Sequence, residues 1–248
     1  MAGRPEHPDA KRSPTRGRRE RSMHDKQLRI FEAAAALFTE RGFDAVGTLE
    51  IAERADVAAG TVFRYASSKA ELLLMVYNRE LRDAIDVGVR AAVAHADPVE
   101  SVNALVQAVL ASSARNPANV VAYQRELLFG PATDEHRTAG LALVGELEDA
   151  IASRLATAAR SRGVDDPLTQ REEQRAARTV FAALSLLLAG PSTGAHPEAD
   201  PTEELRGQIA QIVRGFLATL PSTIERHGGA CHVLQQRQLR GVRASAQA

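Results

Sequence analysis

The segment between residues 48 and 69 carries the side chains whose types and spacing best fit a binding surface. A short helix from about Ala58 to Tyr65 would bury Val62 and turn outward Ala59, Gly60, Thr61, Phe63, Arg64 and Tyr65. An arginine in the major groove of DNA can donate two hydrogen bonds to guanine, worth about 1–3 kcal/mol of discrimination. Arg64 is therefore the best candidate for base recognition, with phosphate contact or simple solvation as the alternatives.

The residues beside Arg64 suit a surface that lies against DNA. Thr61 can hydrogen-bond a base or offer its methyl group to thymine. Gly60 lets a backbone come close. Phe63 cannot donate a hydrogen bond, so it packs on a sugar or a thymine methyl group, or else belongs to the protein core. These residue types indicate binding, not catalysis.

Three short helices are needed to position this surface, and the sequence predicts each of them. Helical periodicity begins at Asp25 and Gly42 ends it. Thr48 is placed to cap the second helix, which runs to residue 55 and whose apolar positions are Leu49, Ile51, Ala52 and Ala55. Asp56 stands at the tight turn, where a residue that tolerates positive φ is required. The arrangement is typical of a helix-turn-helix.

The rest of the chain also reads as helix, broken by Pro, Gly and Asn. A capping box at Ser68-x-x-Glu71 predicts a long helix to about residue 94. Further helices are expected over 98–113, 117–129, 133–162, 168–189 and 202–220. We therefore predict an all-α fold, with an N-terminal three-helix DNA-binding domain followed by a larger helical domain.

Composition limits the classes of protein that fit. The 248 residues are 44% hydrophobic and 25% charged, which is typical of a globular protein and excludes a wholly disordered chain. The longest apolar run, residues 180–190, is too short to cross a bilayer. The N-terminal segment has no apolar stretch of the secretory kind, and Cys231 is the single cysteine. We expect a cytoplasmic protein.

Formal net charge is zero, but residues 1–22 hold seven Lys or Arg against three Asp or Glu. This segment is rich in Pro, Gly and Ser and is predicted to be a disordered basic arm. Its arginines at 16–21 either enter a minor groove or form a solvated tail that adds salt-sensitive affinity.

Residues 28–77 resemble the DNA-binding domain of the tetracycline-repressor (TetR) family. Four blocks carry the resemblance, in order and at matching spacing: AAxxLFxERGFD at 33–44, IAxRAxV at 51–57, GTVFRY at 60–65 and SKAEL at 68–72. Asp56, Ala58 and Ala66 stand where the family usually has Gly, Ser and Phe. Asp56 is compatible with a left-handed turn, Ala58 lacks a capping hydroxyl, and Ala66 implies local repacking.

The resemblance implies roles for three more residues. Thr48 and Lys69 would lie at helix starts beside the DNA backbone, where free N–H groups attract phosphate. Ordinary capping and a solvated lysine are the alternatives. Tyr65 would place its hydroxyl on a phosphate, or else be a half-buried aromatic of the three-helix core.

The resemblance also implies a division of the chain. A basic arm occupies 1–22, the DNA-binding domain 23–83, an effector-binding and dimerisation domain 84–220, and a tail 221–248. The helices at 168–189 and 202–220 would pair with those of a second copy through Val180, Phe181, Leu184, Leu187, Leu188, Leu205, Ile209, Ile212, Val213, Phe216 and Leu217. The alternative is that these stripes are internal core. Candidate ligand-binding residues on the middle helices are Tyr123, Arg125, Glu126, Phe129 and His136.

The function predicted from these observations is a ligand-responsive transcriptional regulator, a repressor that binds a palindromic DNA operator as a homodimer and is released by a small molecule. The alternatives are a non-specific or ligand-independent DNA-binding protein, or a helical ligand-binding protein or enzyme. The common nucleotide-binding, hydrolase and zinc motifs are absent. His227, Cys231 and His232 lie close together but without a second cluster, so we expect no enzyme activity, metal or cofactor.

Overall fold

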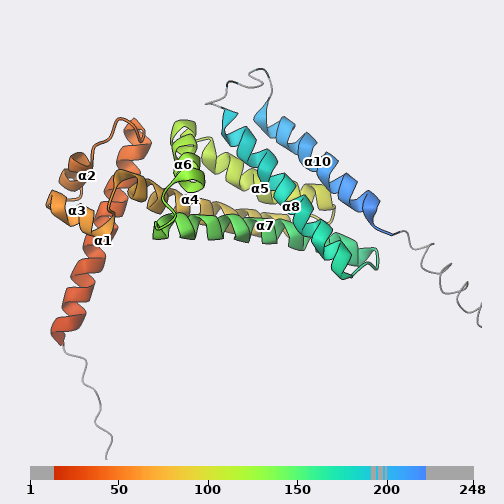
Figure 1. Ribbon diagram of the computed structural model, residues 1–248, viewed down its shortest axis with the longest axis horizontal. Coiled ribbons are helices and arrows are strands. Elements are labelled where there is room, and N and C mark those ends of the chain that lie inside the picture. Colours follow the sequence, from red (N-terminus) through yellow and green to blue (C-terminus); the bar gives the residue numbers. More distant parts are fainter. Residues whose placement is uncertain (1–13, 191–193, 195–197, 199, 222–248) are drawn as a thin grey trace, which may run out of the picture.

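The computed structural model describes residues 14–190, 194, 198 and 200–221, and within them the chain forms helices and no strand (Figure 1). The helices are α1 (Pro14–Arg41), α2 (Thr48–Arg54), α3 (Ala59–Tyr65), α4 (Lys69–Ala92), α5 (Pro98–Ser113), α6 (Pro117–Phe129), α7 (Glu135–Ser161), α8 (Pro167–Leu188) and α10 (Pro201–Thr219). The predicted all-α fold is confirmed.

The helices form two parts that share α4. The short helices α2 and α3 lie with α1 at one end of the molecule, and α4 runs from them into a bundle with α5, α7, α8 and α10 (Figure 1). The bundle has its own apolar core, centred on fully buried leucines and isoleucines of α5, α7 and α10. A second core lies under the three N-terminal helices and also includes residues of α6.

Side chains just before the helices fix where most of them begin. Asp97, Asn116, Asp134, Asp166 and Asp200 each accept a hydrogen bond from a backbone N–H of the first turn that follows. Proline stands in the first turn of α5, α6, α8 and α10, where its missing N–H costs nothing. Ser68 caps α4 by accepting from the Glu71 N–H, as the sequence predicted.

The structure tests the predicted end of the N-terminal arm, but it describes almost none of the predicted C-terminal tail. The arm was expected to reach residue 22, but α1 already begins at Pro14. Arginine, glutamate, methionine and lysine dominate residues 18–26, and their high helix propensity carries α1 back toward the N-terminus. Residues 1–13 and 222–248 lie outside the described part of the chain, and with them most of the predicted C-terminal tail and His227, Cys231 and His232.

Helices α4 and α5 cross in close contact at a glycine. A Cβ atom added at Gly88 would lie 2.3 Å from the backbone oxygen of Leu105, well inside van der Waals contact. Gly88 is itself buried in α4. The crossing therefore depends on the absence of a side chain at this position.

The apolar stripes of α8 and α10 serve mainly the protein's own core. Val180, Leu184, Leu205, Ile209, Val213 and Phe216 are at most 5% exposed, and the other five residues of the stripes are partly buried against them. The six buried residues belong to the interior of one chain, as the alternative held, and pairing with a second copy through the other five stays a prediction. Leu186 of α8, 70% exposed, lies on a different face.

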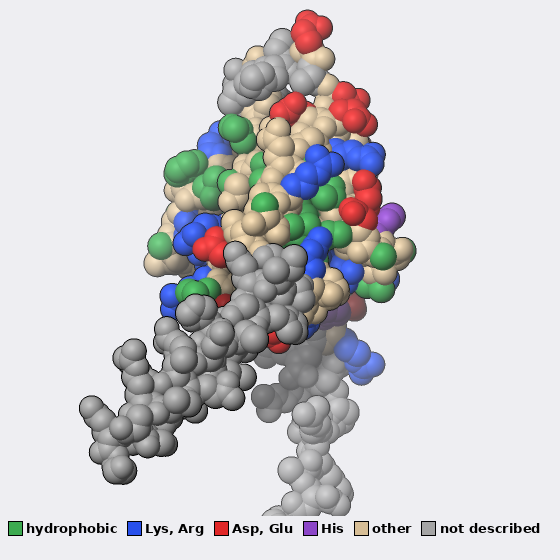
Figure 2. Space-filling view, turned by 90° about the vertical axis from the view of Figure 1, so that its right-hand side faces the viewer, with side chains coloured by type: hydrophobic (Ala, Val, Ile, Leu, Met, Phe, Trp, Pro, Cys, Tyr) green, Lys and Arg blue, Asp and Glu red, His purple; other side chains and the backbone are tan. Residues whose placement is uncertain are grey.

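The surface at the end of the bundle opposite α2 and α3 is mixed. Figure 2 shows Lys and Arg, Asp and Glu, and apolar side chains interspersed there. Within the described ranges, no helix combines the length and apolarity that crossing a membrane requires.

Candidate nucleic-acid interface and effector cavity

The turn between α2 and α3 adopts the geometry expected for Asp56. Its φ of +51° is the left-handed conformation, found at no other non-glycine residue of the described ranges. The N–H groups of Asp56 and Val57 donate to carbonyls of the last turn of α2, at 3.1 and 3.0 Å. Arg29 of α1 contacts both the carboxylate and the carbonyl of Asp56, at 3.3 and 3.4 Å. These bonds hold α3 at a fixed angle to α2.

Helix α3 presents the outward face that its sequence predicts. Val62 is 1% exposed and anchors α3 in the core. Phe63 is 50% exposed, Gly60 and Arg64 are also exposed, and no described hydrogen bond or ion pair holds the Arg64 side chain. Ala59 and Thr61 are half-buried, with Ala59 packed against the core. Their contact with DNA stays a prediction.

Tyr65 and Lys69 make hydrogen bonds inside the protein, and Thr48 takes a different place from the one expected. Thr48 is the first residue of α2 and not its cap, because Gly47 takes that position and the Glu50 carboxylate accepts from the Gly47 N–H at 3.1 Å. The half-buried Tyr65 donates from its hydroxyl to the Met23 carbonyl at 3.1 Å.

Lys69, at the start of α4, contacts Phe43 within the same DNA-binding domain. Its Nζ donates to the Phe43 carbonyl at 2.9 Å and lies 4.3 Å from the centre of the Phe43 ring. Contact of Thr48, Tyr65 and Lys69 with phosphate stays a prediction, and for Tyr65 and Lys69 it would compete with these internal bonds.

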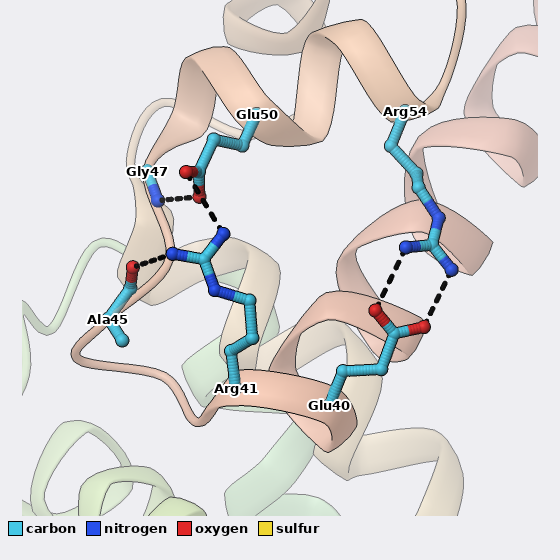
Figure 3. A network of polar contacts seen from close by, with 6 residues as sticks. All are labelled: Glu40, Arg41, Ala45, Gly47, Glu50 and Arg54. Atoms are coloured by element: carbon cyan, nitrogen blue, oxygen red, sulfur yellow. Dashed lines mark hydrogen bonds and ion pairs between the residues drawn. The ribbon is translucent and has the colours of Figure 1, made fainter.

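Two arginine–glutamate pairs hold α2 on the end of α1 (Figure 3). Arg54 and Glu40 are joined by two hydrogen bonds, at 2.9 and 2.7 Å. Arg41 donates to Glu50 at 3.0 Å and to the Ala45 carbonyl at 3.2 Å. Because these charges lie at the surface, water and salt screen them and each pair is expected to add modest stability.

These pairs predict a dependence of stability on pH. Hydrogen bonding to Arg54 lowers the pKa of Glu40, and the Gly47 N–H and Arg41 lower the pKa of Glu50. A lowered pKa in the folded state contributes stability above the ordinary value of 4.5, and this contribution disappears as pH falls through the folded pKa. Melting temperatures of wild type and Glu40→Gln, measured from pH 7 to pH 3, should therefore converge below about pH 4.5. A difference in melting temperature between the two proteins that stays constant from pH 7 to pH 3 would contradict the prediction.

A cavity opens in the bundle behind the DNA-binding domain. It encloses about 680 Å³ of space free of atoms, its open mouth included. Five helices, α4 to α8, contribute to its wall, and most of the lining is apolar: Leu81, Ala84, Val109, Val120, Leu127, Leu128, Val144, Leu147, Phe181, Leu184 and Leu188. A cavity with this largely apolar lining suits the apolar part of a small molecule.

A few polar groups interrupt this lining. Tyr77 and Tyr123 stack with their ring centres 5.7 Å apart, and the Tyr123 hydroxyl donates to Asn78 at 2.8 Å. Burial raises the pKa of Tyr77 to about 12 and that of Tyr123 further, so both phenols are neutral hydrogen-bonding groups. Burial also raises the pKa of Glu80, while Arg115 nearby opposes the shift.

Of the five ligand-binding candidates, the structure brings only Tyr123 to the cavity lining. Arg125 and Phe129 point to solvent, with Phe129 82% exposed, and Arg125 pairs with Glu126 at 3.3 Å. His136 lies in the first turn of α7, where its carbonyl accepts from Asn78 at 2.7 Å. From α6 the lining takes Val120, Tyr123, Gln124, Leu127 and Leu128, and it does not include Arg125, Glu126 or Phe129.

Sequence reasoning missed most of the lining. Tyr77, Glu80, Leu81 and Ala84 follow the i, i+3, i+4, i+7 spacing of a single face of α4. That spacing signals a buried face, but it cannot distinguish one packed against a neighbouring helix from one that lines a hollow.

Comparison with known proteins places this arrangement in a family. The sequence model described as "Bacterial regulatory proteins, tetR family" matches residues 30–76, the segment that holds α2 and α3. FadR of Thermus thermophilus is a TetR family transcriptional repressor whose crystal structure was determined in complex with lauroyl-CoA. Its sequence is 30% identical to this chain, and the two structures superpose with a TM-score of 0.58. The alignment covers 76% of this chain and 94% of FadR. This chain belongs to the TetR family.

Two sequence relatives extend the comparison to other regulators of transcription. An uncharacterised HTH-type transcriptional regulator of Mycobacterium tuberculosis (strain CDC 1551) is 32% identical over 75% of this chain and 82% of the regulator. The HTH-type transcriptional repressor KstR of Mycolicibacterium smegmatis is 35% identical over 54% of this chain. The chain spans 64% of the length of that repressor. These relatives are named as regulators of transcription.

Proposed function

We propose that this protein is a transcriptional repressor that binds a palindromic operator as a homodimer and leaves it when the cavity takes up an effector. One observation carries the proposal. Helix α4 begins beside α3, the helix that presents Arg64, and then forms a wall of the cavity. A change in the cavity can thus alter the position of α3.

Dimerisation is part of the proposal because a two-fold operator needs two copies of α3 at a fixed spacing. The partly buried apolar residues of α8 and α10 support a self-contact on that side of the bundle. An effector that favours a different spacing of the two α3 helices would lower operator affinity.

For the effector we propose a molecule with a long apolar chain, of the fatty-acyl thioester type. The lining of the cavity is largely aliphatic, and Tyr77, Tyr123 and Gln124 place a few polar atoms among its apolar side chains. The similarity to FadR, which was solved with lauroyl-CoA, supports the same class.

The experiment that tests this function is binding of the purified protein to DNA from upstream of its own gene. Selective binding over a scrambled duplex at two salt concentrations, weakened by lauroyl-CoA but not by coenzyme A, is the expected result. Equal, salt-sensitive binding to both duplexes would instead indicate a non-specific DNA-binding protein. Binding of lauroyl-CoA without any DNA binding would favour a ligand-binding protein or enzyme.

Arg64→Ala provides a sharper test of base recognition. If Arg64 reads a guanine, its loss should weaken operator binding by about 1–3 kcal/mol and relax the preference at one base pair in each half-site. Affinities for operators altered one base pair at a time would measure this. Arg125→Ala is the matched control, because Arg125 is an exposed arginine on α6. A preference that does not change in Arg64→Ala would remove Arg64 from base recognition.

A further inference from the structure

A single buried side chain of α6 holds the end of α1. Asn119, 1% exposed, accepts a hydrogen bond from the Phe43 N–H at 2.6 Å and donates one to the Phe38 carbonyl at 2.8 Å. Asn116, the cap of α6, donates a second bond to the same carbonyl at 3.2 Å. The Phe38 carbonyl, in the last turn of α1, and the Phe43 N–H, just after α1, flank the turn at Gly42, whose φ is +82°. We call Asn119 with its two backbone partners the α6 clamp.

The clamp completes a helix end that the local chain leaves unfinished. The last carbonyls of a helix lack partners within the helix. The Gly42 N–H reaches the Phe38 carbonyl at 3.0 Å, and the remaining bonds to that carbonyl come from α6. Because Phe38 and Phe43 are buried, a clamp group left without a partner would be costly. Loss of the Asn119 amide would take this partner from the Phe43 N–H, whereas the Phe38 carbonyl would keep its bonds from Gly42 and Asn116.

The helix that carries Asn119 also forms part of the cavity wall. Val120, the next residue along α6, lines the cavity, as do Tyr123 and Leu127 further along the same helix. Tyr123 stacks there on Tyr77 of α4. Asn119 thus joins a helix of the cavity wall to the end of the helix that supports α2.

We propose that Asn119 is the positioning residue through which cavity occupancy changes the orientation of the DNA-binding domain. A ligand that displaces α6 moves the Asn119 amide, and with it the end of α1 to which Arg54 and Arg41 tie α2. The proposal rests on the proposed function, since it names how the effector would regulate operator binding.

The test compares wild type, Asn119→Ala and Asn103→Ala. Asn103 is a matched control because its side chain makes one described bond, to Gln107 on the same helix. Three quantities are measured for each protein: operator affinity, direct affinity for lauroyl-CoA, and operator affinity with lauroyl-CoA saturating. Hydrogen exchange over residues 38–47 provides a readout that requires neither DNA nor ligand.

Asn119→Ala should bind lauroyl-CoA within about twofold of wild type, yet lose most of the about 5–150-fold effect of lauroyl-CoA on operator affinity. Its exchange over 38–47 should already be fast without ligand, whereas Asn103→Ala should match wild type throughout. An Asn119→Ala protein whose operator affinity still responds to lauroyl-CoA as wild type does would overturn the proposal.

Two further outcomes, a wild type that does not bind lauroyl-CoA and a variant that does not fold, can be told apart from these results. If wild type does not bind lauroyl-CoA, the proposed effector class fails, and the clamp is then judged on operator affinity and exchange alone. If Asn119→Ala then has the same operator affinity and the same hydrogen exchange as wild type, the proposal for Asn119 is overturned. If Asn119→Ala does not fold, Asn119→Asp replaces it, because aspartate keeps the acceptor for Phe43 but cannot donate to Phe38 when ionised. The same expectations and the same contradicting result then apply.

Discussion

Replacing Gly88 by alanine is expected to destabilise the protein by about 3 kcal/mol, the upper end of the usual cost of overpacking. The new methyl group would lie 2.3 Å from the backbone oxygen of Leu105. A side chain can change rotamer to relieve such a contact, but a helix backbone cannot. Relief therefore requires α4 and α5 to separate, and α4 is the helix that both parts of the molecule share. Urea denaturation of wild type and variant measures the loss.

The control is the same substitution at Gly145, in the middle of α7, where an added Cβ would meet nothing within 4 Å. There alanine should stabilise the protein by about 1 kcal/mol, because it favours the helix without a clash. Equal effects at the two glycines would show that the α4–α5 crossing tolerates a side chain, contrary to the close approach described above.

Phe38→Ala is expected to cost about 3–5 kcal/mol and to disrupt the DNA-binding domain first. The Phe38 ring is completely buried and meets the edge of Phe43 at a centre-to-centre distance of 5.5 Å. Its removal leaves a cavity under α2 and α3, beside the turn that the α6 clamp holds. Circular dichroism during urea denaturation, together with operator binding, would measure the effect.

Phe129→Ala is the matched control for this substitution, because the Phe129 side chain is 82% exposed. It should change the free energy of unfolding by less than about 0.5 kcal/mol. A loss in Phe38→Ala no larger than that in Phe129→Ala would mean that the core under α2 and α3 repacks around the missing ring.

The sequence predicted local structure well because local signals are strong in this chain. Proline, glycine, asparagine and aspartate mark nearly every helix end, and Asp56 reveals the left-handed turn. Leu49 is the clearest failure: its place among the apolar positions of the second helix suggested burial, yet it is 65% exposed. Helix α2 has too few turns for its periodicity to decide which apolar residues face inward.

The cavity and the clamp could not be predicted because they arise where distant segments meet. Asn119 and Phe43 lie 76 positions apart, and neither residue type signals the bond between them. The candidate ligand residues were chosen as polar and aromatic residues on the middle helices, but α6 turns only Tyr123 of that set to the cavity. Which face of a helix borders a hollow depends on the packing of all its neighbours.

The core beneath α2 and α3 is not built from the N-terminal residues alone. Val120, Ala122, Tyr123 and Leu127 of α6 are buried in it together with residues of α1 to α4. The predicted boundary at residue 83 therefore divides the chain but not its apolar interior. A chimaera that joined residues 1–83 to the bundle of another family member would inherit a foreign α6 against a native core. Exchange of operator specificity between such proteins requires that the α6 face travel with the recognition helix.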